Sequence, residues 1–194
     1  MRDWEIGLSS WIVQDGNYDD FSRGQTARFA IEFYSKDLSP STSTEKRADR
    51  IKESNYSANG QIVFVNEQCV VLDIGVLSYR QFSPPEWMQA GAWVCGDLYL
   101  GIDPFFYFED LAHTAGMPPM IYEWQLNRIE IETAPFIETL DESGRRLLTR
   151  DETKSAFREI ERTDAWKDDD GNGAYVLHCS MLERPRTHGL HLKS

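Results

Sequence analysis

Residues 92–108 carry the pattern that most constrains the fold, because apolar and polar side chains alternate there with a period of two. Alternation of this kind places the two sets of side chains on opposite faces of a β-strand. The apolar set on the even positions is Val94, Leu98, Leu100 and Ile102. Gly96 and Gly101 interrupt the segment, and glycine inside a strand commonly marks a bulge or a sharp bend. We therefore expect a strand that bends within the curved sheet of a small barrel.

Two further segments also predict strands with a defined geometry. Two apolar runs flank Asn66-Glu67 within residues 61–76, and this arrangement predicts a β-hairpin with a tight turn. Residues 121–137 alternate with a change of phase, since apolar side chains move from even to odd positions after Leu126. A β-bulge near Asn127-Arg128 would bring both sets to the same face of the strand.

Residues 26–34 alternate cleanly and residues 174–182 form an apolar run, so both are expected to be strands. Residues 35–60 have few large apolar side chains and many Ser, Thr, Pro and charged residues. We expect this segment to be a polar surface insertion or loop. Near the C-terminus, Thr149 and Glu152 match a capping box and predict an α-helix over residues 149–166.

These elements predict a mainly β fold, most simply a small, partly closed β-barrel of the OB-like or a related type with one α-helix in its C-terminal region. A two-layer β-sandwich is the alternative, because alternation alone does not separate the two. The length of 194 residues suits a single β-rich domain, 1–194. Three cysteines within apolar runs and the lack of an 18-residue apolar run predict a cytoplasmic protein without a membrane span.

Negative charge is concentrated in residues 86–142. This segment holds eleven carboxylates and one basic residue, Arg128, and therefore carries −10 of the formal net charge of −12. It also holds ten aromatic residues. Nucleic-acid binding depends on cations that neutralise phosphates, so we expect no nucleic-acid partner. A negative surface attracts cations or basic proteins instead.

Acidic and aromatic side chains occupy the odd positions of residues 92–108. This set is Trp93, Asp97, Tyr99, Asp103, Phe105 and Tyr107. We interpret it as a binding face for a basic protein partner, because aromatic residues are enriched at binding hot spots and opposite charge speeds association. The predicted function is a non-enzymatic, acidic protein-binding module, for example an immunity- or antitoxin-like inhibitor. The predicted helix could instead cover this face.

One local motif resembles a calcium-binding loop. Asp168, Asp170 and Asn172 have the spacing of the first three EF-hand ligands, with Gly173 at position 6. Cys179 stands at position 12, where a bidentate Glu is required. The residues are also typical turn formers, so a turn is the preferred interpretation.

A small-ligand-binding protein or hydrolase with a pocket at the barrel mouth is the alternative function. Its candidate residues are Asp73, Asp97, Asp103 and His113, and their convergence in one concave pocket would support it. The chain has no nucleophile elbow, Walker loop, G-x-G-x-x-G, C-x-x-C or H-E-x-x-H motif. We therefore predict no catalytic residue and no cofactor, and we consider an enzyme the less expected class.

Overall fold

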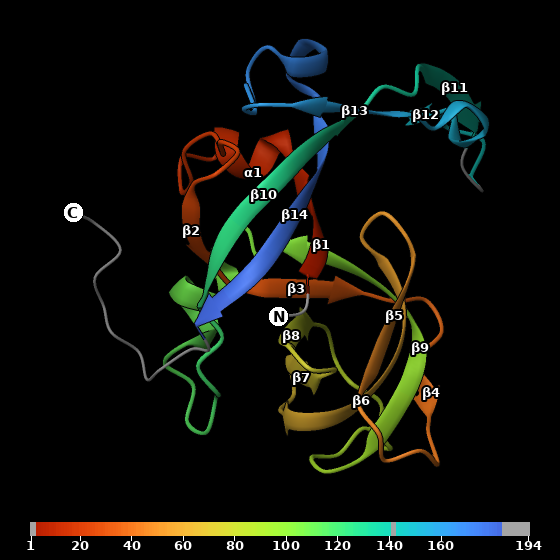
Figure 1. Ribbon diagram of the computed structural model, residues 1–194. Helices are drawn as coiled ribbons and strands as arrows, with labels where there is room; N and C mark the ends of the chain where they lie inside the picture. The colour runs from red at the N-terminus through yellow and green to blue at the C-terminus, as the bar shows by residue number, and fades with distance from the viewer. Residues whose placement is uncertain (1–2, 141–142, 184–194) are drawn as a thin grey trace.

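The computed structural model describes residues 3–140 and 143–183, and it is mainly β, with 51% strand and 10% helical residues (Figure 1). Ten strands follow one another along the main sheet, and β2 and β4 pair beside it. The short helix α1 (Ser10–Gln14) follows the first strand. Helical turns cover Tyr107–Leu111, Glu152–Lys154 and Asp168–Gly171. No helix among these residues has the length and apolar character needed to cross a membrane.

Five strands close into a barrel. They are β3 (Ile31–Tyr34), β6 (Asn55–Val65), β7 (Cys69–Asp73), β8 (Leu77–Gln81) and β9 (Trp93–Ile102). The strand β3 pairs with β8 in parallel and with β9 antiparallel, and the antiparallel pairs β8–β7, β7–β6 and β6–β9 complete the ring. The prediction of a mainly β fold with a small barrel is thus confirmed.

The sheet continues from β9 into an open sheet outside the barrel. Its strands are β1 (Asp3–Ser9), β14 (Ala174–Glu183), β10 (Tyr122–Glu132), β13 (Phe157–Ile160) and β2 (Thr26–Phe29). In Figure 1 the long strands β10 and β14 run side by side from the barrel toward α1 and the loops beyond it. A separate two-stranded hairpin, β11 (Phe136–Leu140) and β12 (Arg146–Arg150), projects from the end of β10.

One apolar core joins the barrel to the open sheet. The predicted inward positions of β9 are all at most 1% exposed. In the open sheet, the Trp124 indole stacks on the Phe29 ring, with centroids 5.5 Å apart and an interplanar angle of 15°. A second, smaller core forms where Tyr79 on the outside of the barrel meets Tyr107 and Met120 from the segment after β9. Burial on both sides of β8 therefore fixes the path of residues 103–121.

The predicted hairpin and bulge are both present. The strands β6 and β7 are adjacent and antiparallel around the Asn66 turn. In β10 the pairing with β14 shifts register between Leu126 and Arg128. Because of this shift, Trp124 and Ile129 are both fully buried although one has an even and the other an odd number.

The predicted α-helix over residues 149–166 is wrong. Thr149 lies in β12 opposite Ile137, and Phe157 lies in β13 opposite Glu132, with only a 3-10 turn between these strands. A capping-box match is a local signal, and pairing with neighbouring strands overrides it here. The helix therefore does not cover the odd face of β9.

The predicted loop at residues 35–60 is also largely strand, since it contains β4 (Ser39–Pro40), β5 (Arg47–Lys52) and the start of β6. The strand β5 pairs with β6 alone. Its exposed Arg and Lys side chains are those of a protected sheet edge, and this explains why the composition resembled that of a loop.

Candidate protein-binding surface

The structure does not bring the predicted partner-binding residues together on one face. Trp93 and Tyr99 are half-buried and Asp97 is exposed. Asp103 and Tyr107 are 0% exposed, so they cannot touch a partner in this structure. The reason is that the segment directly after β9 is buried in the second core. Phe105 is half-buried, as Trp93 and Tyr99 are, but it lies beyond β9.

Asp103 organises the turn that carries Phe105. Its Oδ1 accepts the Tyr79 hydroxyl at 2.5 Å and the Tyr107 backbone N–H at 3.2 Å. Burial raises the pKa of Asp103 to about 6, although these hydrogen bonds oppose the shift. Phe105 has a φ of 86°, which is unusual for a bulky residue. The anchored turn leaves Phe106 exposed.

The residues of the predicted barrel-mouth pocket lie apart. Asp73 Oδ2 is 2.6 Å from Lys46 Nζ at the end of β7. Asp97 is exposed beside Ser57 in the β6–β9 ladder, and His113 is exposed in the segment after the Tyr107–Leu111 turn. Asp103 is enclosed in the second core. Among the described residues, no hydrogen bond or ion pair joins any two of these four side chains, so the geometry does not support the pocket.

The acidic motif at residues 168–173 is a turn in this structure. Asp168 Oδ2 accepts the Tyr175 hydroxyl at 3.0 Å and the Asp164 backbone N–H at 2.8 Å. The Asn172 amide donates to the Asp170 carbonyl at 3.3 Å. Within residues 3–140 and 143–183 no group of three or more His, Cys, Asp or Glu side chains is placed to hold a metal ion.

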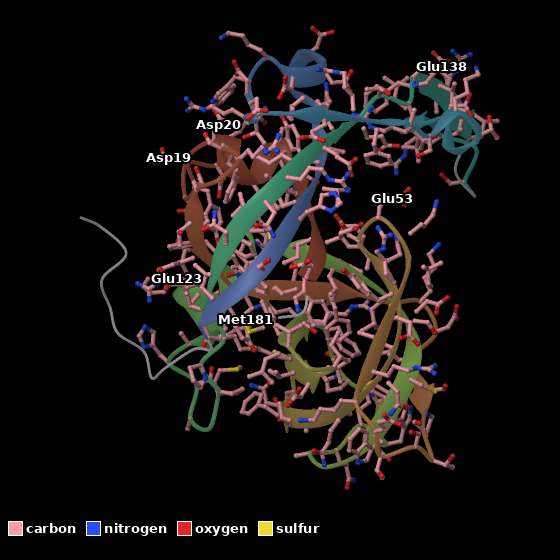
Figure 2. All side chains as sticks on the ribbon, in the orientation of Figure 1. Asp19, Asp20, Glu53, Glu123, Glu138 and Met181 are labelled. Carbon is pink, nitrogen blue, oxygen red and sulfur yellow. The ribbon has the colours of Figure 1, made fainter. Side chains whose placement is uncertain are left out.

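Three segments that are distant in the sequence are linked in the open sheet, because the first contacts each of the other two. They are residues 11–20, 105–110 and 163–170, and we call them together the acidic aromatic surface. The Tyr18 and Phe105 rings touch edge to face with centroids 5.8 Å apart. Asp20 Oδ1 accepts the Ala165 backbone N–H at 2.9 Å, which fixes the first segment to the third. Figure 2 shows Asp19 and Asp20 on the loop that follows α1.

This surface combines exposed aromatic side chains with a high density of negative charge. The exposed aromatics are Trp11 (49%), Phe106 (40%) and Trp166 (69%). The carboxylates are Asp15, Asp19, Asp20, Glu109, Asp110, Asp164, Asp168, Asp169 and Asp170. With Lys167 as the single base among nine acids, the three segments carry −8 of the net charge of −12. Lys167 is itself paired with Asp164 at 3.0 Å.

The β11–β12 hairpin is tied to the edge of this surface by Arg150. The Arg150 guanidinium contacts Asp169 at 2.5 Å and donates to the Asn172 carbonyl at 2.9 Å. The hairpin exposes several large apolar side chains, and Leu140 (69%) and Leu148 (70%) are the most exposed of them. It therefore adds an apolar projection beside the acidic aromatic surface.

Sequence reasoning missed most of this surface because its parts are far apart in the chain. The sequence of residues 15–20 indicates a turn, and that of residues 168–173 indicates a turn or a calcium-binding loop, so neither pattern predicts a protein-binding surface. The available signal was the position of Trp11 and Trp166 directly beside these acidic clusters. The pairing of β1 with β14 brings the two clusters to one end of the sheet.

Comparison with known proteins gives no relative, since no family model, no curated protein and no solved structure matches this chain. The class of protein is therefore defined by the fold and the surface alone: a closed five-stranded β-barrel extended by an open sheet that carries an acidic aromatic surface at its loops.

Proposed function

We propose that this protein is a non-enzymatic protein-binding module and that its acidic aromatic surface binds a basic protein. The observation that carries the proposal is the exposure of Trp11, Phe106 and Trp166 in three short segments that together hold nine carboxylates. Large aromatic side chains dominate the energy of protein interfaces. Clustered carboxylates attract a basic partner over distance and raise the association rate.

An immunity- or antitoxin-like role is the concrete form of this proposal. A net charge of −12 on 194 residues suits a protein that covers the basic surface of a toxin or nuclease. A cytoplasmic location is part of the same proposal. Its support is the three free cysteines, of which Cys69 and Cys179 are buried.

We also propose that the barrel is OB-like. The support is its five strands in a closed ring with a single parallel pair, β3–β8. In this protein the proposed contact surface is not the barrel wall, and it belongs to the loops of the open sheet.

Site-directed photo-crosslinking tests the proposed surface. A photoreactive phenylalanine analogue would replace Trp166, and in a matched control it would replace Trp87, which is 39% exposed but lies outside the three segments. We expect the Trp166 position to crosslink a basic protein in the native host and the Trp87 position to give no such product. Equal yields at the two positions, or capture of acidic proteins only, would contradict the proposal.

Affinity measurements on the captured partner complete the test. We expect Trp166→Ala to weaken binding roughly ten- to hundredfold, as truncation of an interface hot spot does. Trp87→Ala should leave the dissociation constant within about twofold, because residues outside an interface contribute little. Higher salt should lower the association rate of the wild-type protein, since exposed charges are screened.

A further inference from the structure

Four half-buried glutamates lie on the outer face of the sheet where the barrel meets the open sheet. Glu5 on β1 is opposite His178, and Glu32 on β3 is opposite Gly101, which in turn pairs with Gly7 of β1. Residues opposite each other in a ladder share a face. Glu130 and Glu132 on β10 lie on the same face, next to β14.

Three of these glutamates have a cation or an imidazole as partner. Glu5 contacts Arg50 and lies 3.2 Å from His178 Nδ1. Glu130 lies 2.7 Å from His178 Nε2 and 3.6 Å from Arg128. Glu132 is 3.4 Å from Arg150. Glu32 is the exception, since no ion pair joins it to any cation within the described part of the chain.

Aromatic groups surround Glu32. A Cβ placed on Gly101 would lie 3.7 Å from Glu32 Oε1 and 3.2 Å from the Tyr99 ring, so the carboxylate and this ring lie over the same glycine. Tyr34 is opposite Tyr99, with ring centroids 6.4 Å apart, and it lies two residues from Glu32 on the same face of β3. Tyr34 is also 50% exposed. Glu32 itself is half-buried, so its carboxylate lies beside two tyrosine rings near the surface.

The other titratable groups around Glu32 do not supply a positive charge. Asp103 lies directly after β9, Tyr18 in the loop after α1 and Tyr79 on β8, and each interacts electrostatically with Glu32. Asp103 is 0% exposed, and among the described residues its Oδ2 has no hydrogen-bond partner. Arg80 lies over the Tyr34 ring, with its Cζ 5.9 Å from the ring centroid, but it is closer to the Phe82 ring at 4.9 Å and donates to the Ser35 carbonyl. When Glu32 is ionised, its negative charge therefore has no ion-pair partner among the described residues, unlike the charges of the other three glutamates.

We propose that Glu32, between Tyr34 and Tyr99, is a binding site for a guanidinium or primary ammonium group, supplied by an Arg or Lys side chain of the basic partner. A carboxylate gives such a group a charge-assisted hydrogen bond. Tyrosine rings attract cations through their faces. Tyr18 links the neighbourhood of this site to the acidic aromatic surface, because its hydroxyl donates to the Asp103 carbonyl at 2.9 Å while its ring contacts Phe105. The identity of the donor as a protein side chain rests on the proposed function.

Binding at this site is linked to pH. Burial, followed by the charge of Asp103, raises the pKa of Glu32 to about 7, and the Tyr34 hydrogen bond opposes the shift. A bound cation favours the ionised carboxylate and lowers its pKa. Binding therefore releases a proton near neutral pH, and the affinity for the cation rises as pH increases through about 7.

A small cation tests the site without the partner. The pH titration of Glu32 would be followed through its carboxyl carbon in ¹³C-glutamate-labelled protein, with ethylguanidinium chloride, butylammonium chloride or sodium chloride at equal ionic strength. We expect the midpoint of Glu32 to fall by roughly half a pH unit or more with an organic cation that donates hydrogen bonds. Glu32→Gln removes this signal, and Glu132→Gln retains it. Identical midpoints in all three salts would overturn the site.

The partner protein tests the second half of the inference. We expect Glu32→Gln to weaken binding roughly tenfold at pH 8 and to flatten the pH profile between 6 and 8, as loss of one charge-assisted contact does. Glu132→Gln should keep the pH profile of the wild type. A partner that crosslinks at Trp166 but is insensitive to Glu32→Gln would overturn the inference alone. If ethylguanidinium lowers the titration midpoint of Glu32 but crosslinking captures no basic protein, the cation site is supported and the proposed function is contradicted.

Discussion

The barrel and the open sheet use the same strand ladder in opposite ways. Each barrel strand has a neighbour on both sides, and in the ring β3–β8–β7–β6–β9 no edge is free. The open sheet ends at β13 and β2, and its connections carry the acidic aromatic surface. Closure removes edges that could pair with other chains, whereas the loops of the open sheet present side chains at little cost to the core. Stability and recognition are therefore assigned to different parts of one ladder.

The charges of the two regions differ in the same way. Beside the barrel, two carboxylates pair with cations, in Lys46–Asp73 and in Arg47–Asp49 of the edge strand β5. On the acidic aromatic surface one base accompanies nine acids. Repulsion among these carboxylates opposes folding, so the core that fixes the three segments has to be rigid. Phe29 and Trp124, which stack beneath the loops, belong to the core that also lines the barrel.

The largest loss of stability is expected from removal of the Trp124 side chain, which is 0% exposed in the core shared by the barrel and the open sheet. We expect Trp124→Ala to lower the free energy of unfolding by about 3–5 kcal/mol. Because one core spans both regions, urea unfolding followed by circular dichroism should remain a single transition with an earlier midpoint. Ile62→Ala in the barrel should behave alike, with a loss of roughly 2–5 kcal/mol. Two separate transitions in either variant would show that barrel and open sheet unfold independently.

Arg150 tests how the hairpin is held on the open sheet. Its side chain is 12% exposed and contacts Glu132, Asp169 and two backbone carbonyls. We expect Arg150→Ala to cost roughly 2–3 kcal/mol, since both carboxylates lose their cation. Hydrogen exchange should accelerate in residues 136–150. The matched variant Arg146→Ala, at a residue 79% exposed, should change stability by less than about 0.5 kcal/mol.

The sequence predicts features that depend on neighbouring residues better than features that depend on distant strands. Alternation identified β9 and β10, and the phase change placed the bulge at Arg128, because these signals depend only on neighbouring residues. The path of Thr149 and the edge strand β5 depended on pairing with distant strands, which no local pattern contains. The acidic aromatic surface was missed for the same reason. Its three segments meet only after the sheet is assembled.

Asp103, which lies where the chain leaves the barrel strand β9, makes the free energy of unfolding depend on pH. Its pKa is raised from 3.8 to about 6 in the fold, so its ionisation destabilises the protein as pH rises through this range. We expect about 1–2 kcal/mol of stability to be lost between pH 5 and 8 on this account. Asp103→Asn keeps an acceptor for Tyr79 and Tyr107 but has no charge. Urea unfolding of the variant at the two pH values should therefore show a correspondingly smaller difference, and an unchanged difference would contradict this origin.

The smallest effect is expected at Leu148, although it is a large apolar residue in a strand. It is 70% exposed and lies in the hairpin, opposite Glu138 and outside both cores. Leu148→Ser should change the free energy of unfolding by no more than about 0.5 kcal/mol, whereas the equivalent change at Leu98 in the barrel should be severe. A large exposed leucine that contributes little to stability still costs solubility. Sedimentation at high protein concentration should therefore show less self-association for Leu148→Ser, and a loss of stability comparable with that of Leu98→Ser would mean that the hairpin packs against the body of the protein.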